Sequence, residues 1–136
     1  MSIREEIRLA IDNLKMAYTP YSNFKVSSVL IGRSDKIYTG VNIENASLTP
    51  TNCAERTAFF KAVSEGEKEF KRIIIVGGKD GKVDDYCAPC GVCRQVMMEF
   101  CDPEEFEVIV AKDEDDYKLF KLKELLPLGF GPSNLK

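Results

Sequence analysis

The sequence contains no histidine among its 136 residues. This absence excludes every catalytic triad or dyad that depends on an imidazole, and every zinc site with histidine ligands. Polar chemistry in this chain must therefore come from cysteine, carboxylate, lysine, tyrosine or hydroxyl side chains.

Long apolar runs and clusters of basic residues are also missing. The longest apolar candidate, residues 73–76, is too short to cross a bilayer and is typical of a buried strand. The N-terminal segment is acidic and amphipathic and lacks the apolar core of a secretory signal. We therefore expect a cytoplasmic protein with no membrane partner. The net charge of −3, without a basic run, argues against polymeric nucleic acid as a partner.

The remaining composition is that of an ordinary globular domain, with 44% hydrophobic and 30% charged residues. We find no repeat or linker, so a single domain over residues 1–136 is expected. In a reducing compartment, five cysteines favour metal binding or catalysis over a disulfide framework.

Hydrophobic spacing predicts an α/β fold. A first helix should begin after Ser2, which forms a capping box with Glu5, and end near Thr19-Pro20. Strands are expected at residues 24–32 and 36–43, and then at 71–77 and 106–111. Helices are expected at 52–65 and from 90 to just before 103, and the acidic run 113–116 is typical of a solvated turn. This order predicts a central sheet flanked by helices, with parallel, right-handed final crossovers.

Cys90 and Cys93 form a C-x-x-C pair, which indicates either a metal site or a redox dithiol. Zinc needs more than two ligands, and no second C-x-x-C pair exists. Cys101 lies in an apolar segment typical of a packed thiol. Cys87 can lie beside the site, and we give it no ligand role.

Cys53 stands two residues before Glu55 at the expected start of a helix. Three sulfurs and one open position describe a catalytic zinc site. Three thiolates with Zn²⁺ carry a net charge of about −1. The N-termini of the helices at Cys53 and Cys90 can offset this charge, and Arg56 can donate hydrogen bonds to a ligand sulfur. Without that neighbour, Arg56 would be interpreted as a surface ion-pair residue.

Several motifs in order along the chain resemble the cytidine deaminase family, in the small form that acts on free nucleosides. In this form cysteine replaces the histidine of the H-x-E motif that precedes P-C-x-x-C. The matching segments cover nearly the whole chain: Phe24-Lys-Val, Asn42-Ile-Glu44-Asn45, Cys53-Ala-Glu-Arg-Thr-Ala, Pro89-Cys-Gly-Val-Cys-Arg-Gln-Val and Leu125-Leu-Pro-Leu-Gly-Phe130.

The resemblance implies a three-layer α-β-α fold with a mixed, five-stranded central sheet. It implies one zinc ion per subunit on Cys53, Cys90 and Cys93, with Glu55 as the residue that moves protons. The implied reaction is hydrolytic deamination of cytidine and 2′-deoxycytidine, with release of ammonia, in pyrimidine salvage.

The resemblance also implies the residues that hold the nucleoside. Asn42 and Glu44 would bind the sugar, Phe24 would line the pocket, and the Ala54 backbone N–H would bind the pyrimidine. Phe130 would lie over the pyrimidine of a neighbouring subunit, which implies a homotetramer with shared active sites. Many relatives carry tyrosine where this chain has Leu48, so no tyrosine role is transferred there.

Three alternatives stay open at this point. A deaminase of a modified cytosine nucleoside, such as the blasticidin S type, would share the motifs. A structural zinc-binding interaction module would leave Glu55 without a task. A cytosolic redox protein would use Cys90 and Cys93 as its dithiol.

Overall fold

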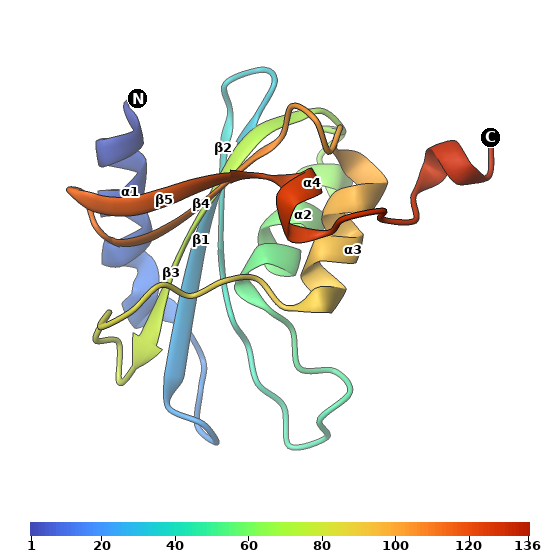
Figure 1. Cartoon of the computed structure of the whole chain (residues 1–136). Helices are drawn as coiled ribbons and strands as arrows, with labels where there is room; N and C mark the ends of the chain where they lie inside the picture. Colours follow the sequence, from blue (N-terminus) through green and yellow to red (C-terminus); the bar gives the residue numbers. More distant parts are fainter.

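The structure, a computed structural model, describes residues 1–136 and contains one mixed sheet with helices on both faces (Figure 1). The strands are β1 (Phe24–Gly32), β2 (Ile37–Val41), β3 (Phe70–Lys79), β4 (Glu107–Asp113) and β5 (Asp116–Lys121). They lie in the order β2-β1-β3-β4-β5. All neighbouring pairs are antiparallel except β3 and β4, whose pairing is parallel, as predicted for the final crossover.

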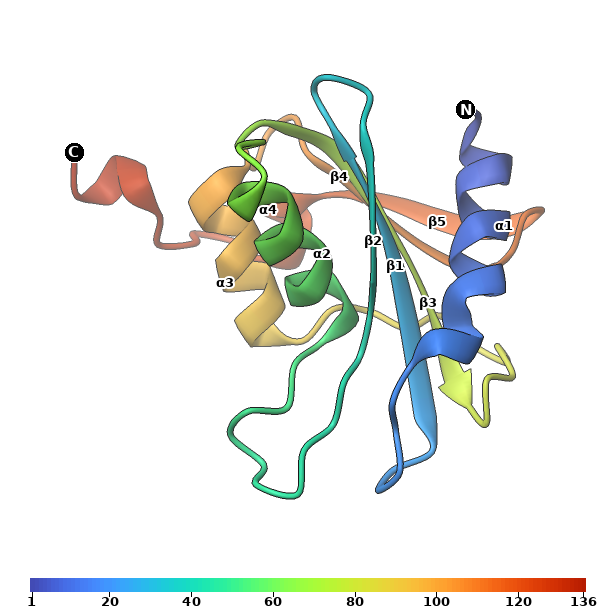
Figure 2. The same ribbon diagram turned by 180° about the vertical axis from the view of Figure 1, so that it is seen from behind.

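Helix α1 (Ile3–Asn13) covers one face of the sheet and continues into a short 3-10 turn, Leu14–Met16. The predicted capping box is present, because Ser2 Oγ accepts from the Glu5 N–H and Glu5 accepts from the Ser2 N–H. The opposite face carries α2 (Ala54–Ser64) and α3 (Gly91–Phe100), with α4 (Leu122–Leu125) beside α3 (Figure 2). These three layers confirm the predicted architecture.

Strand β3 packs between two apolar clusters, which explains why its sequence contains a continuous apolar run. Ile73 and Ile75 face the cluster under α2 and α3, which includes Phe59 and Met97. Ile74 and Val76 face the smaller cluster under α1. The alternation of β-strand side chains thus divides one apolar segment between two cores.

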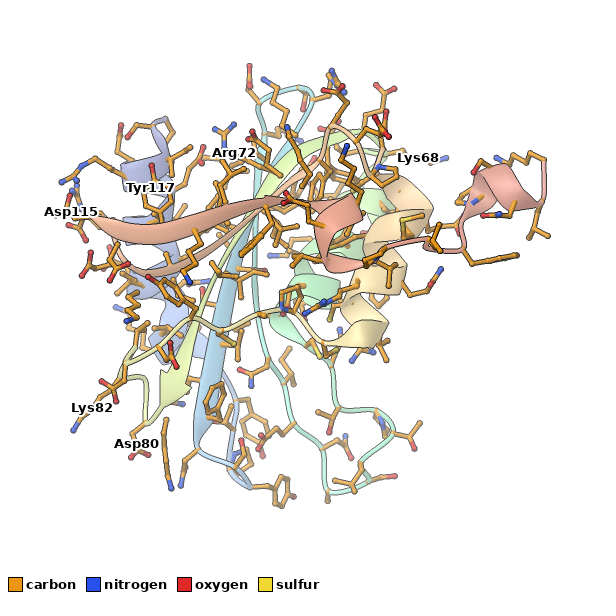
Figure 3. All side chains as sticks on the ribbon, viewed as in Figure 1. Lys68, Arg72, Asp80, Lys82, Asp115 and Tyr117 are labelled. Atoms are coloured by element: carbon orange, nitrogen blue, oxygen red, sulfur yellow. The ribbon has the colours of Figure 1, made fainter.

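Residue patterning alone missed β5, although the resemblance implied a fifth strand. Three of its six residues are exposed and the others are partly buried, and it carries charged side chains, as edge strands commonly do. Within the acidic run, Glu114 and Asp115 form the turn between β4 and β5, and Asp115 lies beside α1 (Figure 3), where it pairs with Arg4.

Glu6 of α1 forms an ion pair with Arg72 of β3, which is labelled in Figure 3. The Glu6 side chain is only 1% exposed, and Arg72 Nε donates to its Oε1 at 2.7 Å. This pair holds α1 in place on the sheet. None of the helices is both long enough and apolar enough to cross a membrane.

Candidate metal centre and active site

Three cysteine sulfurs meet where the N-termini of α2 and α3 converge. Cys90 Sγ lies 3.9 Å from Cys53 Sγ and 3.6 Å from Cys93 Sγ, and all three sulfurs lie within 4.8 Å of one another. In a tetrahedral site with zinc–sulfur bonds of about 2.3 Å, the sulfurs lie about 3.8 Å apart. The spacing therefore fits one zinc ion held by three thiolates.

The local fold places these thiols at sites that favour negative charge. Cys53 is the N-cap of α2 and Cys90 is the N-cap of α3, so both stand at the positive end of a helix dipole. Arg56 Nη2 also donates to Cys53 Sγ at 3.1 Å. This combination matches the charge compensation expected for a site without histidine.

Hydrogen bonds from Cys93 and then Arg56 lower the pKa of the Cys53 thiol to about 5, against the opposing effect of burial. The pKa of Cys93 is raised instead, because it donates to Cys53 and because its thiol is buried. The Cys53 thiol is thus the more acidic of the two, and the Cys93 thiol holds its proton more tightly. Zinc binding would displace that proton, as it does for any coordinating thiol.

Glu55 lies in the first turn of α2 and is buried, with an exposed fraction of only 4%. Burial raises the pKa of this carboxyl to about 7. A carboxyl group with this pKa can both accept and donate a proton near neutral pH, which is the property of a general acid–base group.

A cavity of about 180 Å³ opens beside the sulfurs and Glu55. It brings together six of the predicted site residues, with Asn42, Glu44 and Ala54 joining Cys53, Glu55 and Cys90. Of its remaining lining residues, Cys87 was expected beside the site, and four were not predicted: Val26, Thr51, Asn52 and Ala88. Most of these adjoin a motif residue, and Val26 shares the strand face of Ser28, which contacts α2. Their positions within or next to the motifs are the sequence signal that could have predicted these lining residues.

Asn42 and Glu44 already contact the protein around the cavity. Asn42 Oδ1 accepts from the Val26 N–H at 2.9 Å, and its Nδ2 donates to the Phe24 carbonyl at 2.8 Å. The Glu44 carboxylate accepts from the Tyr21 N–H at 2.9 Å and from the N–H and hydroxyl of Ser22. These bonds from Ser22 and Tyr21 lower the pKa of Glu44, so its charge is available at the cavity edge.

Two of the residues predicted to bind the substrate do not line this cavity. Phe24 is 43% exposed and lines the adjacent cavity, which also borders Cys87. Phe130 is 58% exposed on a C-terminal segment that runs outward past α3 (Figures 1 and 2). Its carbonyl accepts from Gln95 Nε2 at 2.8 Å, and its ring makes no contribution to the site of its own chain.

The structure also shows where the three other residues discussed from the sequence lie: Leu48, Cys101 and Cys87. Leu48 is 83% exposed on the loop between β2 and α2, which projects from the body (Figure 2). Cys101 is buried in the core, as the apolar segment predicted. Cys87 lies beside the site without joining the sulfur cluster, and burial raises its pKa to about 11.

The fold and the site together define an α/β protein with a candidate catalytic zinc centre. The family model "Cytidine and deoxycytidylate deaminase zinc-binding region" matches residues 2–110, a segment that includes all three clustered cysteines and Glu55. The chain therefore belongs to the cytidine and deoxycytidylate deaminase family.

Individual relatives agree with this assignment. A cytidine deaminase of Sporosarcina psychrophila is 43% identical over 89% of this chain and 85% of its own length. A probable cytidine deaminase of Dictyostelium discoideum is 42% identical over 97% of this chain and 88% of its own length. The crystal structure of a cytidine deaminase from Burkholderia pseudomallei has a TM-score of 0.86 at 40% identity, and covers 96% of this chain and 100% of that one.

Proposed function

We propose that this protein is a zinc-dependent deaminase that converts cytidine and 2′-deoxycytidine to uridine and 2′-deoxyuridine. The observation that carries the proposal is the three-sulfur cluster beside the buried carboxyl of Glu55, at one end of a cavity. A structural zinc site is normally closed by a fourth protein ligand. This cluster offers three, which leaves a position for chemistry.

Cys53, Cys90 and Cys93 would hold the zinc ion, with Arg56 donating to the Cys53 sulfur. Zinc held there supplies Lewis-acid activation of water near neutral pH. Glu55 accepts a proton from the attacking water and delivers it to N3 of the ring, and then takes the second proton from the new C4 hydroxyl and delivers it to the leaving amino group. The water oxygen bonds to C4 and the C4–N4 bond breaks. One water proton stays on N3 and the other leaves with ammonia.

The cavity residues give a basis for nucleoside binding. Glu44 presents a carboxylate that can accept from a ribose hydroxyl, and Asn42 stands beside it with further hydrogen-bonding capacity on its amide. Ala54 would present its backbone N–H to the pyrimidine. Phe24 lines the neighbouring cavity and would cover the nucleoside from that side.

We further propose a homotetramer with shared active sites, located in the cytoplasm and acting in pyrimidine salvage. The exposed aromatic ring of Phe130, on a segment that extends away from the body, supports a role in the site of a neighbouring subunit. Its side chain does not line the cavity of its own chain.

The test measures the absorbance change on deamination of cytidine, 2′-deoxycytidine and blasticidin S, with the zinc content of the same sample. We expect turnover of both plain nucleosides and about one zinc per chain. Turnover of blasticidin S alone would indicate that the substrate is a modified cytosine nucleoside. Zinc without any turnover would favour a structural module, and a titratable dithiol without zinc would favour a redox protein.

A further inference from the structure

The first turn of α2 carries Cys53, Ala54, Glu55 and Arg56, so its position on the sheet sets the position of the site. Two hydroxyl side chains outside this set join that turn to β1 and β2. They are Ser28 of β1 and Thr57 of α2 itself.

Ser28 is fully buried in the middle of β1, on the strand face that meets α2. Its Oγ donates to the Ala54 carbonyl at 2.9 Å. A serine at such a position gives up apolar packing, and its hydroxyl must find a partner there. That partner is the peptide group between Ala54 and Glu55.

Thr57 makes the second connection. Its single hydroxyl proton is shared between the carbonyls of Val41, at 3.1 Å, and Cys53, at 3.0 Å. The same oxygen accepts from Asn52 Nδ2 at 3.2 Å. The threonine therefore joins three segments: the residue before Cys53, the turn that Cys53 begins, and the end of β2.

The end of β2 leads directly to the residues proposed to hold the sugar. Val41 is followed by Asn42, and the backbones of Ile43 and Asn52 exchange two hydrogen bonds of 2.9 Å. The Thr57 contact thus fixes the metal-binding turn relative to the strand end that carries Asn42 and Glu44.

Building on the proposed function, we propose that Ser28 and Thr57 are positioning residues for deamination. They fix the first turn of α2 against β1 and β2, so that Glu55 and Cys53 stand in register with the nucleoside held by Asn42 and Glu44. Neither hydroxyl touches the substrate cavity, and neither acts on the reacting atoms.

The experiment compares Thr57→Val, Thr57→Ser and Ser28→Ala with the unchanged protein. Valine keeps the branched shape of threonine and removes only the hydroxyl, whereas serine keeps the hydroxyl and removes the methyl group. Ser64→Ala is the matched control, because the Ser64 hydroxyl donates to the Lys61 carbonyl at the opposite end of the same helix, at 2.7 Å. For each variant, kcat and KM for cytidine, zinc content and melting temperature are measured.

We expect kcat in Thr57→Val and Ser28→Ala to fall about tenfold or more while zinc stays bound, because sub-ångström displacement of catalytic groups is costly. Thr57→Val should also raise KM, since it separates the turn from the sugar-binding strand end. Thr57→Ser and Ser64→Ala should stay within about threefold of the parent, a range too small to indicate displaced catalytic groups.

The inference is wrong if the zinc-loaded, folded Thr57→Val and Ser28→Ala variants keep the parent kcat and KM while only their melting temperatures fall. It is also wrong if Thr57→Ser loses as much activity as Thr57→Val. Absence of cytidine turnover in the parent protein would instead refute the proposed function. If one variant fails to fold, the other decides the question.

Discussion

Replacing Gly40 with alanine should weaken both the fold and the active site, because α2 lies directly on β2 at this glycine. An added Cβ would meet the Ala54 carbonyl oxygen at 2.3 Å and the Ala58 nitrogen at 2.7 Å. Both are backbone atoms, so neither can turn aside as a flexible side chain would. The helix itself must move.

The size of that movement follows from the contact distances. Cβ atoms essentially never approach another heavy atom within 3.0 Å, so the Ala54 carbonyl must retreat by at least 3.0 − 2.3 = 0.7 Å. Overpacking of this kind costs about 1–3 kcal/mol, which corresponds to a fall of about 3–10 °C in melting temperature for a domain of this size. Because the same turn carries Cys53 and Glu55, we expect kcat/KM to fall about 10- to 100-fold.

Thermal unfolding and cytidine turnover of Gly40→Ala measure these two effects. Gly91→Ala controls for the loss of glycine, since a Cβ there meets nothing within 4 Å, and it should unfold at or above the parent temperature. A Gly40→Ala protein that unfolds and turns over like its parent would refute the view that close approach at Gly40 positions the site.

Glu55→Gln should keep the zinc and lower turnover at least about 100-fold, because the amide cannot transfer protons; near-parental turnover would remove Glu55 from its role. Cys53→Ala should release zinc, as metal analysis would reveal, and full zinc retention would exclude this sulfur as a ligand. Glu6→Gln should lower stability to urea by about 1–3 kcal/mol, because it leaves Arg72 without its buried charge partner. The matched Arg8→Ala variant breaks only an exposed ion pair on the same helix, and its effect should stay below about 1 kcal/mol.

Local pattern predicted the elements that have strong periodicity or clear termini. The expected strand over residues 24–32 coincides with β1, and the Ser2/Glu5 capping box starts α1 as predicted. Strand β5 was missed because it is a short edge strand with three charged residues among six and no buried residue, so its pattern is a weak signal. Its pairing with β4 is a tertiary contact that local sequence does not encode.

The site was predictable to the extent that its residues sit in motifs. The spacing of Cys90 and Cys93 indicated two sulfurs near each other, the position of Cys53 before Glu55 at a helix start suggested the third, and the resemblance then implied all three as ligands. The position of Phe24 in the neighbouring cavity depends on a side-chain orientation that no motif specifies. The contacts of Ser28 and Thr57 join segments distant in sequence, so residue type alone gave no reason to select them.

The absence of histidine explains why the helix termini matter at this site. A neutral imidazole ligand would add no negative charge, whereas three thiolates and Zn²⁺ together would give the metal site a net charge of about −1. That charge must be offset by nearby dipoles and cations if water is to be activated near neutral pH. Cys53 and Cys90 both occupy N-cap positions, and Arg56 donates to Cys53 from one turn further along α2. Whatever fixes the first turn of α2 therefore fixes the charge balance of the metal as well as the position of Glu55, which is why Gly40, Ser28 and Thr57 bear on the chemistry without touching the substrate.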